Sequence, residues 1–202
     1  MMKRIALLGF AVLAVFAAAT GLLACWRTCA SAPAVSDGLG QPRILVAYFS
    51  RSGNTEVLAQ VIALETGGRL FRIIPAVPYS DNYRETVARF QYERDNRIRP
   101  AVASKVDDMA QYDVVFVGYP NWGSDIPPVV QSFLTQYDFS GKTIVPFCTH
   151  GGGGFGHSME TLKTLCPDSV IRQGFEVNGR RVVQSGDDIA LWLERIGLKP
   201  GY

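Results

Sequence analysis

The chain has 202 residues, 48% of them hydrophobic, and a formal net charge of +2. Lys3 and Arg4 are the only charged residues before residue 26, so the rest of the chain has no net charge. A nucleic-acid-binding protein needs a basic excess to neutralise phosphates, and this balance excludes nucleic acid as the expected partner. The composition of residues 26–42 predicts a flexible tether. Residues 43–202 are enough for one domain with a sizeable core.

The N-terminus begins with a basic leader and continues as an uncharged, mostly apolar run from Ile5 to Trp26. This pattern predicts an export signal over residues 1–25. The sequence Leu22-Leu23-Ala24-Cys25 is similar to a bacterial lipobox, which makes Cys25 a lipidation candidate. Cleavage near Ala32 and an uncleaved membrane anchor are the alternatives. We therefore expect an exported protein, periplasmic or on the cell surface, that is attached to the membrane through its N-terminus.

A buried strand followed by a polar turn is the first strong signal of the domain. Ile44–Phe49 is a continuous apolar run, typical of a strand covered on both faces. It is followed at once by Ser50-Arg51-Ser52-Gly53-Asn54-Thr55 and then by a helical pattern. Hydroxyl groups, an amide, a glycine and unpaired helix N–H groups together predict a phosphate-binding nest. An ordinary turn with a Thr or Asn N-cap is the alternative.

Strand and helix patterns alternate along the rest of the domain, which predicts a five-stranded parallel sheet with helices on both faces. The predicted strands are Ile44–Phe49, Leu70–Ile74, Val114–Gly118, Thr143–Phe147 and a weaker Val170–Val177. The predicted helices are Thr55–Thr66, Asp81–Arg97, Pro128–Tyr137, Ser158–Leu165 and Gly186–Ile196. In a doubly wound sheet the ligand binds beyond the carboxyl ends of the strands, so the loops after strands one, three and four should converge.

Two of those loops carry residues suited to a flat ligand. After the third strand, Trp122 lies among turn-forming residues, where it could stack on a planar ring or instead pack on the next helix. After the fourth strand, the run 151–154 consists of four glycines, whose N–H groups are unobstructed by side chains. The alternative is that this glycine run is only a flexible surface loop. His150 could adjust the charge around a bound ring or be a solvated loop histidine.

These stretches resemble the flavodoxin family. The loop Ser-x-Ser-Gly-Asn-Thr is similar to the family's FMN-phosphate loop, and Tyr119-Pro120-Asn121-Trp122 to the flavin loop of a subfamily that carries Tyr-Pro-x-Trp. The resemblance implies a flavodoxin-like, doubly wound α/β fold and FMN as cofactor, with a possible peptide flip at Gly123. The residues that it places against FMN are Ser50, Arg51, Ser52, Gly53, Asn54, Thr55, Tyr119, Pro120, Asn121, Trp122, Gly123, Thr149, His150, Gly151, Gly152, Phe155 and Gly156.

Other chemistries are weaker interpretations of the same chain. Gly151-x-Gly153-x-x-Gly156, with Glu176 downstream, fits a dinucleotide fingerprint, but that motif normally follows the first strand of the fold. The two histidines, His150 and His157, lack a local carboxylate cluster, so a metal site is not expected. Cys148 and Cys166 should lie at opposite edges of the sheet, too far apart to bridge, and are expected to be buried free thiols.

The sequence thus favours an FMN-binding protein that transfers electrons outside the cytoplasmic membrane, with a redox partner protein or a small-molecule acceptor. An NAD(P)H-dependent FMN quinone reductase is one alternative, and a non-redox extracytoplasmic binding module on the same fold is another. No residue resembles a general acid, base or nucleophile, so the chemistry is expected to come from the cofactor.

Overall fold

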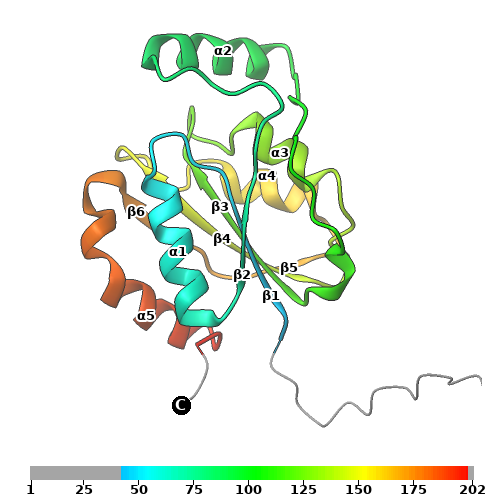
Figure 1. Cartoon of the computed structure of the whole chain (residues 1–202), viewed down its shortest axis with the longest axis vertical. Coiled ribbons are helices and arrows are strands. Elements are labelled where there is room, and N and C mark those ends of the chain that lie inside the picture. Colours follow the sequence, from blue (N-terminus) through cyan, green and yellow to red (C-terminus); the bar gives the residue numbers. More distant parts are fainter. Residues whose placement is uncertain (1–41, 200–202) are drawn as a thin grey trace, which may run out of the picture. The chain divides into compact units, whose positions relative to one another are not determined.

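The computed structural model describes residues 42–199 (Figure 1), so the predicted export signal, Cys25 and almost all of the predicted tether lie outside the described residues. The strands are β1 Ile44–Tyr48, β2 Arg69–Arg72, β3 Val114–Pro120, β4 Thr143–His150, β5 Val170–Ile171 and β6 Phe175–Asn178. The α-helices are α1 Asn54–Thr66, α2 Tyr83–Asp95, α3 Pro128–Leu134, α4 Ser158–Leu165 and α5 Gly186–Arg195. Within the described chain no helix is long and apolar enough to cross a membrane.

All strands pair in parallel, in the order β2-β1-β3-β4-β5, and β6 also pairs with β4. The expected doubly wound parallel sheet is confirmed, but the expected fifth strand, 170–177, is split in two. Ile144 pairs with Ile171 and Phe147 with Phe175, so three residues of the edge strand oppose two of β4. One of those two is Pro146, which has no N–H to donate, and the extra residue forms a bulge there.

The sheet is covered on both faces, as expected. Side chains alternate along a strand, so Leu45 and Ala47 of β1 belong to one buried cluster and Val46 and Tyr48 to the other. The first cluster includes residues of α3 and α4, and the second includes residues of α1 and α5. β1 is buried along its whole length and lies between β2 and β3 in the sheet.

Helix α2 departs from the expected arrangement. The expectation was a helix over 81–97 that covers the sheet, but α2 stands beyond the carboxyl ends of the strands (Figure 1). Only Thr86, Phe90 and Glu93 of this helix are buried, so it has no apolar face with which to cover a sheet. Residues of the segments that flank α2 fill that part of the core instead: Ile73, Tyr79, Val106, Met109 and Tyr112.

A polar network anchors α2 to the rest of the domain. The hydroxyl of Tyr79 donates a hydrogen bond to Glu93 Oε2 at 2.6 Å, and Arg89 Nε donates to Glu93 Oε1 at 2.7 Å. The Arg89 guanidinium also lies 4.0 Å from the centre of the Tyr79 ring. The Glu93 side chain is only 6% exposed, so its charge depends on these two partners for stabilisation.

Buried tyrosines should make the fold sensitive to alkali. Burial, and secondarily the Glu56 carboxylate, raises the pKa of Tyr48 to about 12, and burial raises the pKa values of Tyr79 and Tyr119 further still. Unfolded tyrosines ionise near pH 10, so stability that is complete below this pH falls as the pH rises toward 12. Each group should contribute about 1.4 kcal/mol per pH unit.

Urea unfolding at about pH 9, 10 and 11 measures this loss. Tyr79→Phe removes one titrating group and should reduce the slope of unfolding free energy against pH by about one proton. A variant slope identical to that of the wild type would show that Tyr79 does not contribute.

Candidate functional site

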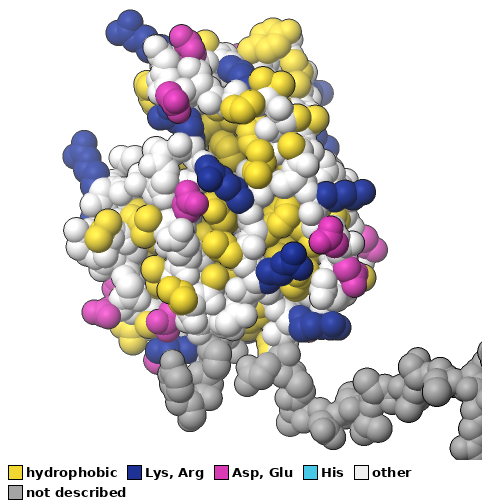
Figure 2. All heavy atoms as spheres, viewed as in Figure 1, with side chains coloured by type: hydrophobic (Ala, Val, Ile, Leu, Met, Phe, Trp, Pro, Cys, Tyr) yellow, Lys and Arg dark blue, Asp and Glu magenta, His cyan; other side chains and the backbone are white. Residues whose placement is uncertain are grey.

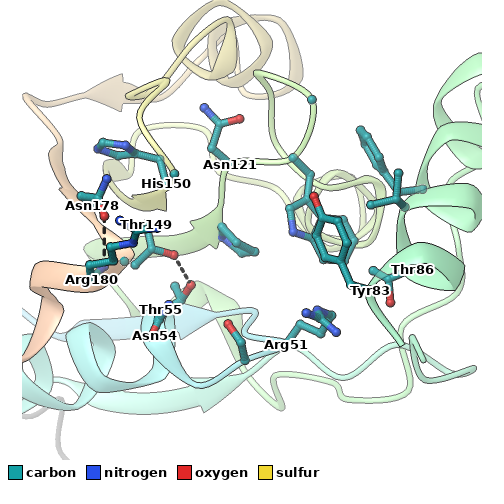
Figure 3. A pocket seen from close by; sticks show the side chains of 18 of the residues that line it. Arg51, Asn54, Thr55, Tyr83, Thr86, Asn121, Thr149, His150, Asn178 and Arg180 are labelled. Atoms are coloured by element: carbon teal, nitrogen blue, oxygen red, sulfur yellow. Dashed lines mark hydrogen bonds between the residues drawn. The ribbon is translucent and has the colours of Figure 1, made fainter. Parts of the chain in front are cut away.

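The loops after β1, β3 and β4 converge at one edge of the sheet, as the topology requires. They surround a cavity of about 680 Å³, a size common for small-molecule sites (Figure 3). The predicted site residues that line this cavity are Arg51, Ser52, Asn54, Thr55, Pro120, Asn121, Trp122, Gly123, Thr149, His150 and Gly151. Ser50, Gly53, Tyr119, Gly152, Phe155 and Gly156 were predicted with them and are not among the lining residues.

The loop before α1 leaves the helix N-terminus open. Gly53 is the N-cap residue, with a φ of 91° that favours glycine, and no side chain caps the helix. Val57 is the first residue whose N–H bonds within the turn, to Gly53 O at 3.0 Å. The alternative interpretation of this turn, a helix capped by a Thr or Asn side chain, is therefore not observed. The backbone N–H groups of residues 54–56 remain for a ligand. An anion would be stabilised there by these groups and by the helix dipole.

Two side-chain hydrogen bonds hold this loop in place. Ser50 is buried, and its Oγ accepts a hydrogen bond from Gly53 N at 3.1 Å. Thr55 and Thr149, both buried, share a hydrogen bond of 2.8 Å between their hydroxyl oxygens, so the loops after β1 and β4 are tied together. In that pair one hydroxyl donates to the other, and the accepting hydroxyl keeps its own proton for a ligand.

The loop after β3 makes a tight turn at its centre. Trp122 and Asp125 exchange backbone hydrogen bonds of 3.1 and 3.2 Å, and Gly123 and Ser124 between them have positive φ values of 60° and 66°. These are the backbone angles of a type I′ turn. A Cβ at Gly123 would also lie 2.6 Å from Phe90 Cζ, so the residue is constrained both by its φ and by the approach of α2.

The Trp122 ring packs among other aromatic rings and also lines the cavity. Its centre lies 5.4 Å from that of Phe49, 4.9 Å from that of Tyr79 and 5.7 Å from that of Phe90, in edge contacts. These aromatic partners come from the residue after β1, the segment before α2 and α2 itself. Stacking of Trp122 on a bound ring stays a prediction.

The glycine-rich loop after β4 divides into a lining part and a packing part. His150 and Gly151 line the cavity, and His150 Nδ1 accepts a hydrogen bond from Gly152 N at 3.0 Å. Phe155 packs against the core instead. A Cβ at Gly156 would lie 2.2 Å from the Ser124 carbonyl oxygen, so close packing against the neighbouring loop explains this glycine without a dinucleotide ligand.

Comparison with known proteins agrees with this geometry. A family model described as flavodoxin matches residues 43–196. The chain belongs to the flavodoxin family. It is 34% identical to a candidate flavoprotein from Bacteroides eggerthii DSM 20697, covering 78% of this chain and 99% of that one with a TM-score of 0.66. A candidate flavoprotein from Bacteroides uniformis ATCC 8492 is 30% identical over 77% of this chain and 99% of that one, with a TM-score of 0.69.

A flavoprotein from Lactobacillus acidophilus NCFM, solved in complex with FMN, has the same fold at 18% identity. It covers 71% of this chain and 97% of its own, with a TM-score of 0.61. A search of curated proteins found no match. Membership of the flavodoxin family supports FMN as the expected cofactor, whereas the Tyr-Pro-x-Trp subfamily stays a prediction.

Two segments of this flavodoxin line the cavity without having been predicted. The first is one face of α2: Tyr83, Thr86, Val87, Phe90, Gln91 and Arg94. The second lies at the carboxyl end of β6: Asn178, Gly179 and Arg180. The second segment follows the carboxyl end of a strand and could have been predicted by the rule used for the other loops. The face of α2 carries no such signal, because its role depends on where the helix packs.

The cavity of the flavodoxin domain is basic. Arg51, Arg94, Arg180 and His150 line it, and among residues 42–199 no Asp or Glu does. Figure 2 shows acidic and basic side chains interspersed on the face that it presents, so the one-sided charge is a local property of the cavity. An anionic ligand is therefore favoured there.

Metal and thiol chemistry find little support in the described part of the flavodoxin chain. Residues 42–199 hold no group of three His, Cys, Asp or Glu side chains that could bind a metal ion. Cys148 and Cys166 are buried free thiols, which confirms the expectation from their positions. Burial raises the pKa of Cys148 to about 12 and that of Cys166 to about 11, so both thiols are protonated and unreactive at neutral pH.

Proposed function

We propose that this flavodoxin binds FMN in the cavity at the carboxyl edge of the sheet and transfers electrons. The observation that carries the proposal is the open N-terminus of α1 inside a cavity that also contains Trp122. The first feature suits a phosphate and the second a planar ring, and FMN has both. Ser52, Asn54 and Thr55 would hold the phosphate. The residues that would hold the ring and its polar edge are Pro120, Asn121, Trp122, Gly123, His150 and Gly151.

FMN, when bound, supplies the redox chemistry, and the protein supplies binding and electrostatics. Asn121 is held in place for this task, because its N–H donates to Thr149 O at 2.8 Å and its side-chain amide donates to Gly154 O. A Cβ at Gly151 would meet no atom within 4 Å, so there is room for a ligand beside this backbone. Asn121 thereby ties the loop after β3, called the ring loop below, to the glycine-rich loop after β4.

Purification of the full chain in detergent, followed by a visible spectrum and titration with FMN, tests the proposal. We expect flavin absorption bands, one FMN per chain, and riboflavin affinity well below that of FMN. A colourless protein that takes up no FMN would contradict the proposed function.

The second candidate function is FMN-dependent reduction of a small acceptor, such as a quinone, at the expense of NAD(P)H. It is favoured by the extent of the cavity, which continues past the ring loop to α2. Steady-state oxidation of NAD(P)H in the presence of a quinone separates the two functions, because a carrier that only serves partner proteins should show almost none. A binding module without redox activity would bind flavin, but neither NAD(P)H nor a partner protein would reduce that flavin.

We also propose that the protein acts outside the cytoplasmic membrane and is attached to it. The apolar run Ile5–Trp26 and the lipobox-like sequence ending at Cys25 support this location. The wild type should fractionate with membranes. Cys25→Ser should release the protein if Cys25 is acylated and should leave it membrane-bound if the helix is uncleaved. Wild-type protein in the soluble cytoplasmic fraction would contradict the proposal.

A further inference from the structure

Helix α2 presents one continuous stripe to the cavity. Tyr83, Thr86, Val87, Phe90, Gln91 and Arg94 line it, a spacing that places all six side chains on one face of the helix. In Figure 3, Tyr83 and Thr86 lie across the cavity from Asn178 and Arg180. The cavity thus has a wall that belongs neither to the phosphate loop nor to the loops after β3 and β4.

The stripe combines aromatic surface with a single cation. Tyr83 is 71% exposed although it lines the cavity, and Phe90 contacts the Trp122 ring. At the end of the stripe, the Arg94 guanidinium lies 5.3 Å from the centre of the Phe90 ring. A Cβ at Gly123 would be 3.2 Å from Arg94 Nη1, so this cation lies beside the ring loop.

Arg94 remains available to a ligand. It pairs with Asp95 at 2.8 Å, but both side chains are about half exposed or more, and such a surface pair contributes little. Asp95 does not line the cavity. Asp95 Oδ1 engages the Nε and Nη2 groups of Arg94, which leaves three of the five guanidinium N–H donors for an anion beside Phe90 and Gly123.

A second cavity, of about 440 Å³, adjoins the same place. It shares Phe90, Arg94, Trp122 and Gly123 with the first and adds Arg97 and Arg99. Its two carboxylates are already engaged: Glu93 by Arg89 and Tyr79, and Asp125 by Ile126 N at 2.7 Å and the Thr161 hydroxyl at 2.9 Å. Arg94, Arg97 and Arg99 outnumber these two carboxylates, so the residues that line each of the two cavities carry a net positive formal charge.

We propose that the α2 stripe is a second ligand site, which takes a planar aromatic molecule with one anionic substituent. The ring would lie against Tyr83 and Phe90, and the anion against Arg94. The proposal rests on the proposed FMN function, since such a ligand would lie in the cavity assigned to the flavin. It distinguishes this chain from a carrier that meets only proteins, because a carrier needs no site for a small acceptor.

Calorimetric titration of the oxidised, FMN-loaded full chain tests the site. The probe is anthraquinone-2-sulfonate, and its neutral counterpart is 2-(hydroxymethyl)anthraquinone. The sulfonate should bind at least about tenfold more tightly than the neutral compound. Arg94→Gln should weaken the sulfonate about 10- to 100-fold, as expected for the loss of a charge-assisted hydrogen bond, and change the neutral compound less than about threefold. Tyr83→Ala should weaken both compounds alike.

Arg84→Gln is the matched control, because Arg84 is an exposed arginine on the same helix that lines neither cavity. It should leave the affinity for both compounds unchanged. Loss of sulfonate affinity in Arg84→Gln equal to that in Arg94→Gln would overturn the proposal, as would failure of the wild type to bind either compound.

Titration of flavin-free wild type, Arg94→Gln and Tyr83→Ala with FMN separates this proposal from the proposed function. FMN affinity within about threefold of the wild type supports a separate second site. An FMN affinity that falls as far as the probe affinity would show that α2 holds the flavin itself, and the second site would be wrong. Absence of FMN binding by the wild type would overturn the proposed function and the second site with it.

Discussion

Asn54→Asp should weaken FMN binding by about 30- to 700-fold while it stabilises the flavin-free protein. Asn54 lines the cavity in the first turn of α1, where the helix has no side-chain cap. A carboxylate about 4–6 Å from a bound phosphate would repel it by roughly 2–4 kcal/mol at the effective dielectric constant of a protein surface. The same carboxylate interacts favourably with the helix dipole and should add about 0.3–1 kcal/mol to the stability of the flavin-free fold.

This variant is informative because the affinity for FMN should fall while the stability of the flavin-free fold rises. A protein that failed to fold would lose both stability and ligand binding, whereas here only FMN binding should fall. Fluorescence titration with FMN and with riboflavin, and urea unfolding without flavin, measure the three quantities. Riboflavin lacks the phosphate, so its affinity should change less than about threefold, and added salt should reduce the penalty for FMN.

Asn82→Asp provides the matched control for the phosphate site. Asn82 is the N-cap of α2, its side chain accepts hydrogen bonds from Arg84 N and Glu85 N, and it does not line the cavity. The same change there should affect helix stability alone and leave FMN affinity unaltered. If Asn54→Asp weakened riboflavin as much as FMN, the phosphate would not lie at α1.

Glu93→Ala should lower the free energy of unfolding by about 3–5 kcal/mol, the cost of breaking a buried ion pair from one side. The Glu93 side chain is 6% exposed and receives hydrogen bonds from Tyr79 at 2.6 Å and Arg89 at 2.7 Å. Without the carboxylate, the Tyr79 hydroxyl loses its acceptor and the partly buried Arg89 charge loses its counterion. Because this network anchors α2, the wall of the cavity should loosen as well.

Urea unfolding measures the loss of stability, and hydrogen exchange of the α2 amides shows where it occurs. Glu93→Gln keeps an acceptor for Tyr79 but removes the charge, so its loss should be smaller. Glu85→Ala is the control, since Glu85 is exposed on the same helix and accepts a hydrogen bond from the Ser80 hydroxyl. A loss below about 1 kcal/mol for Glu93→Ala would show that α2 does not depend on this network.

Parts of the site that are formed by residues adjacent in the chain could be predicted from the sequence. The apolar run at residues 44–48 marks a buried strand, and a glycine among hydroxyl and amide residues follows it directly. The loops after β3 and β4 could be placed beside it because parallel strands bring their carboxyl ends to one edge. Eleven predicted residues therefore line the cavity, and each of them lies in one of these three loops, at the end of the strand before it or in the first turn of the helix after it.

The sequence does not indicate contacts that depend on a distant partner. Trp122 packs against Phe49, Tyr79 and Phe90, three rings that are far from it in the sequence. Gly156 and Phe155 belong to the same glycine-rich loop as Gly151, yet they pack against the protein instead of lining the cavity. Composition marks the loop as unobstructed, but which of its residues face the ligand depends on how the loop folds.

The sequence by itself determined the α/β class, the order of strands and helices, and the polar, glycine-containing turn before α1, because each depends on neighbours within a few residues. Only the tertiary structure decided that α2 stands beyond the carboxyl ends of the strands and that Arg94 and Arg180 line the cavity. It also decided the break between β5 and β6 opposite Pro146. The physical reason is that a helix pattern specifies the spacing of side chains along one face, whereas long-range packing selects what that face meets.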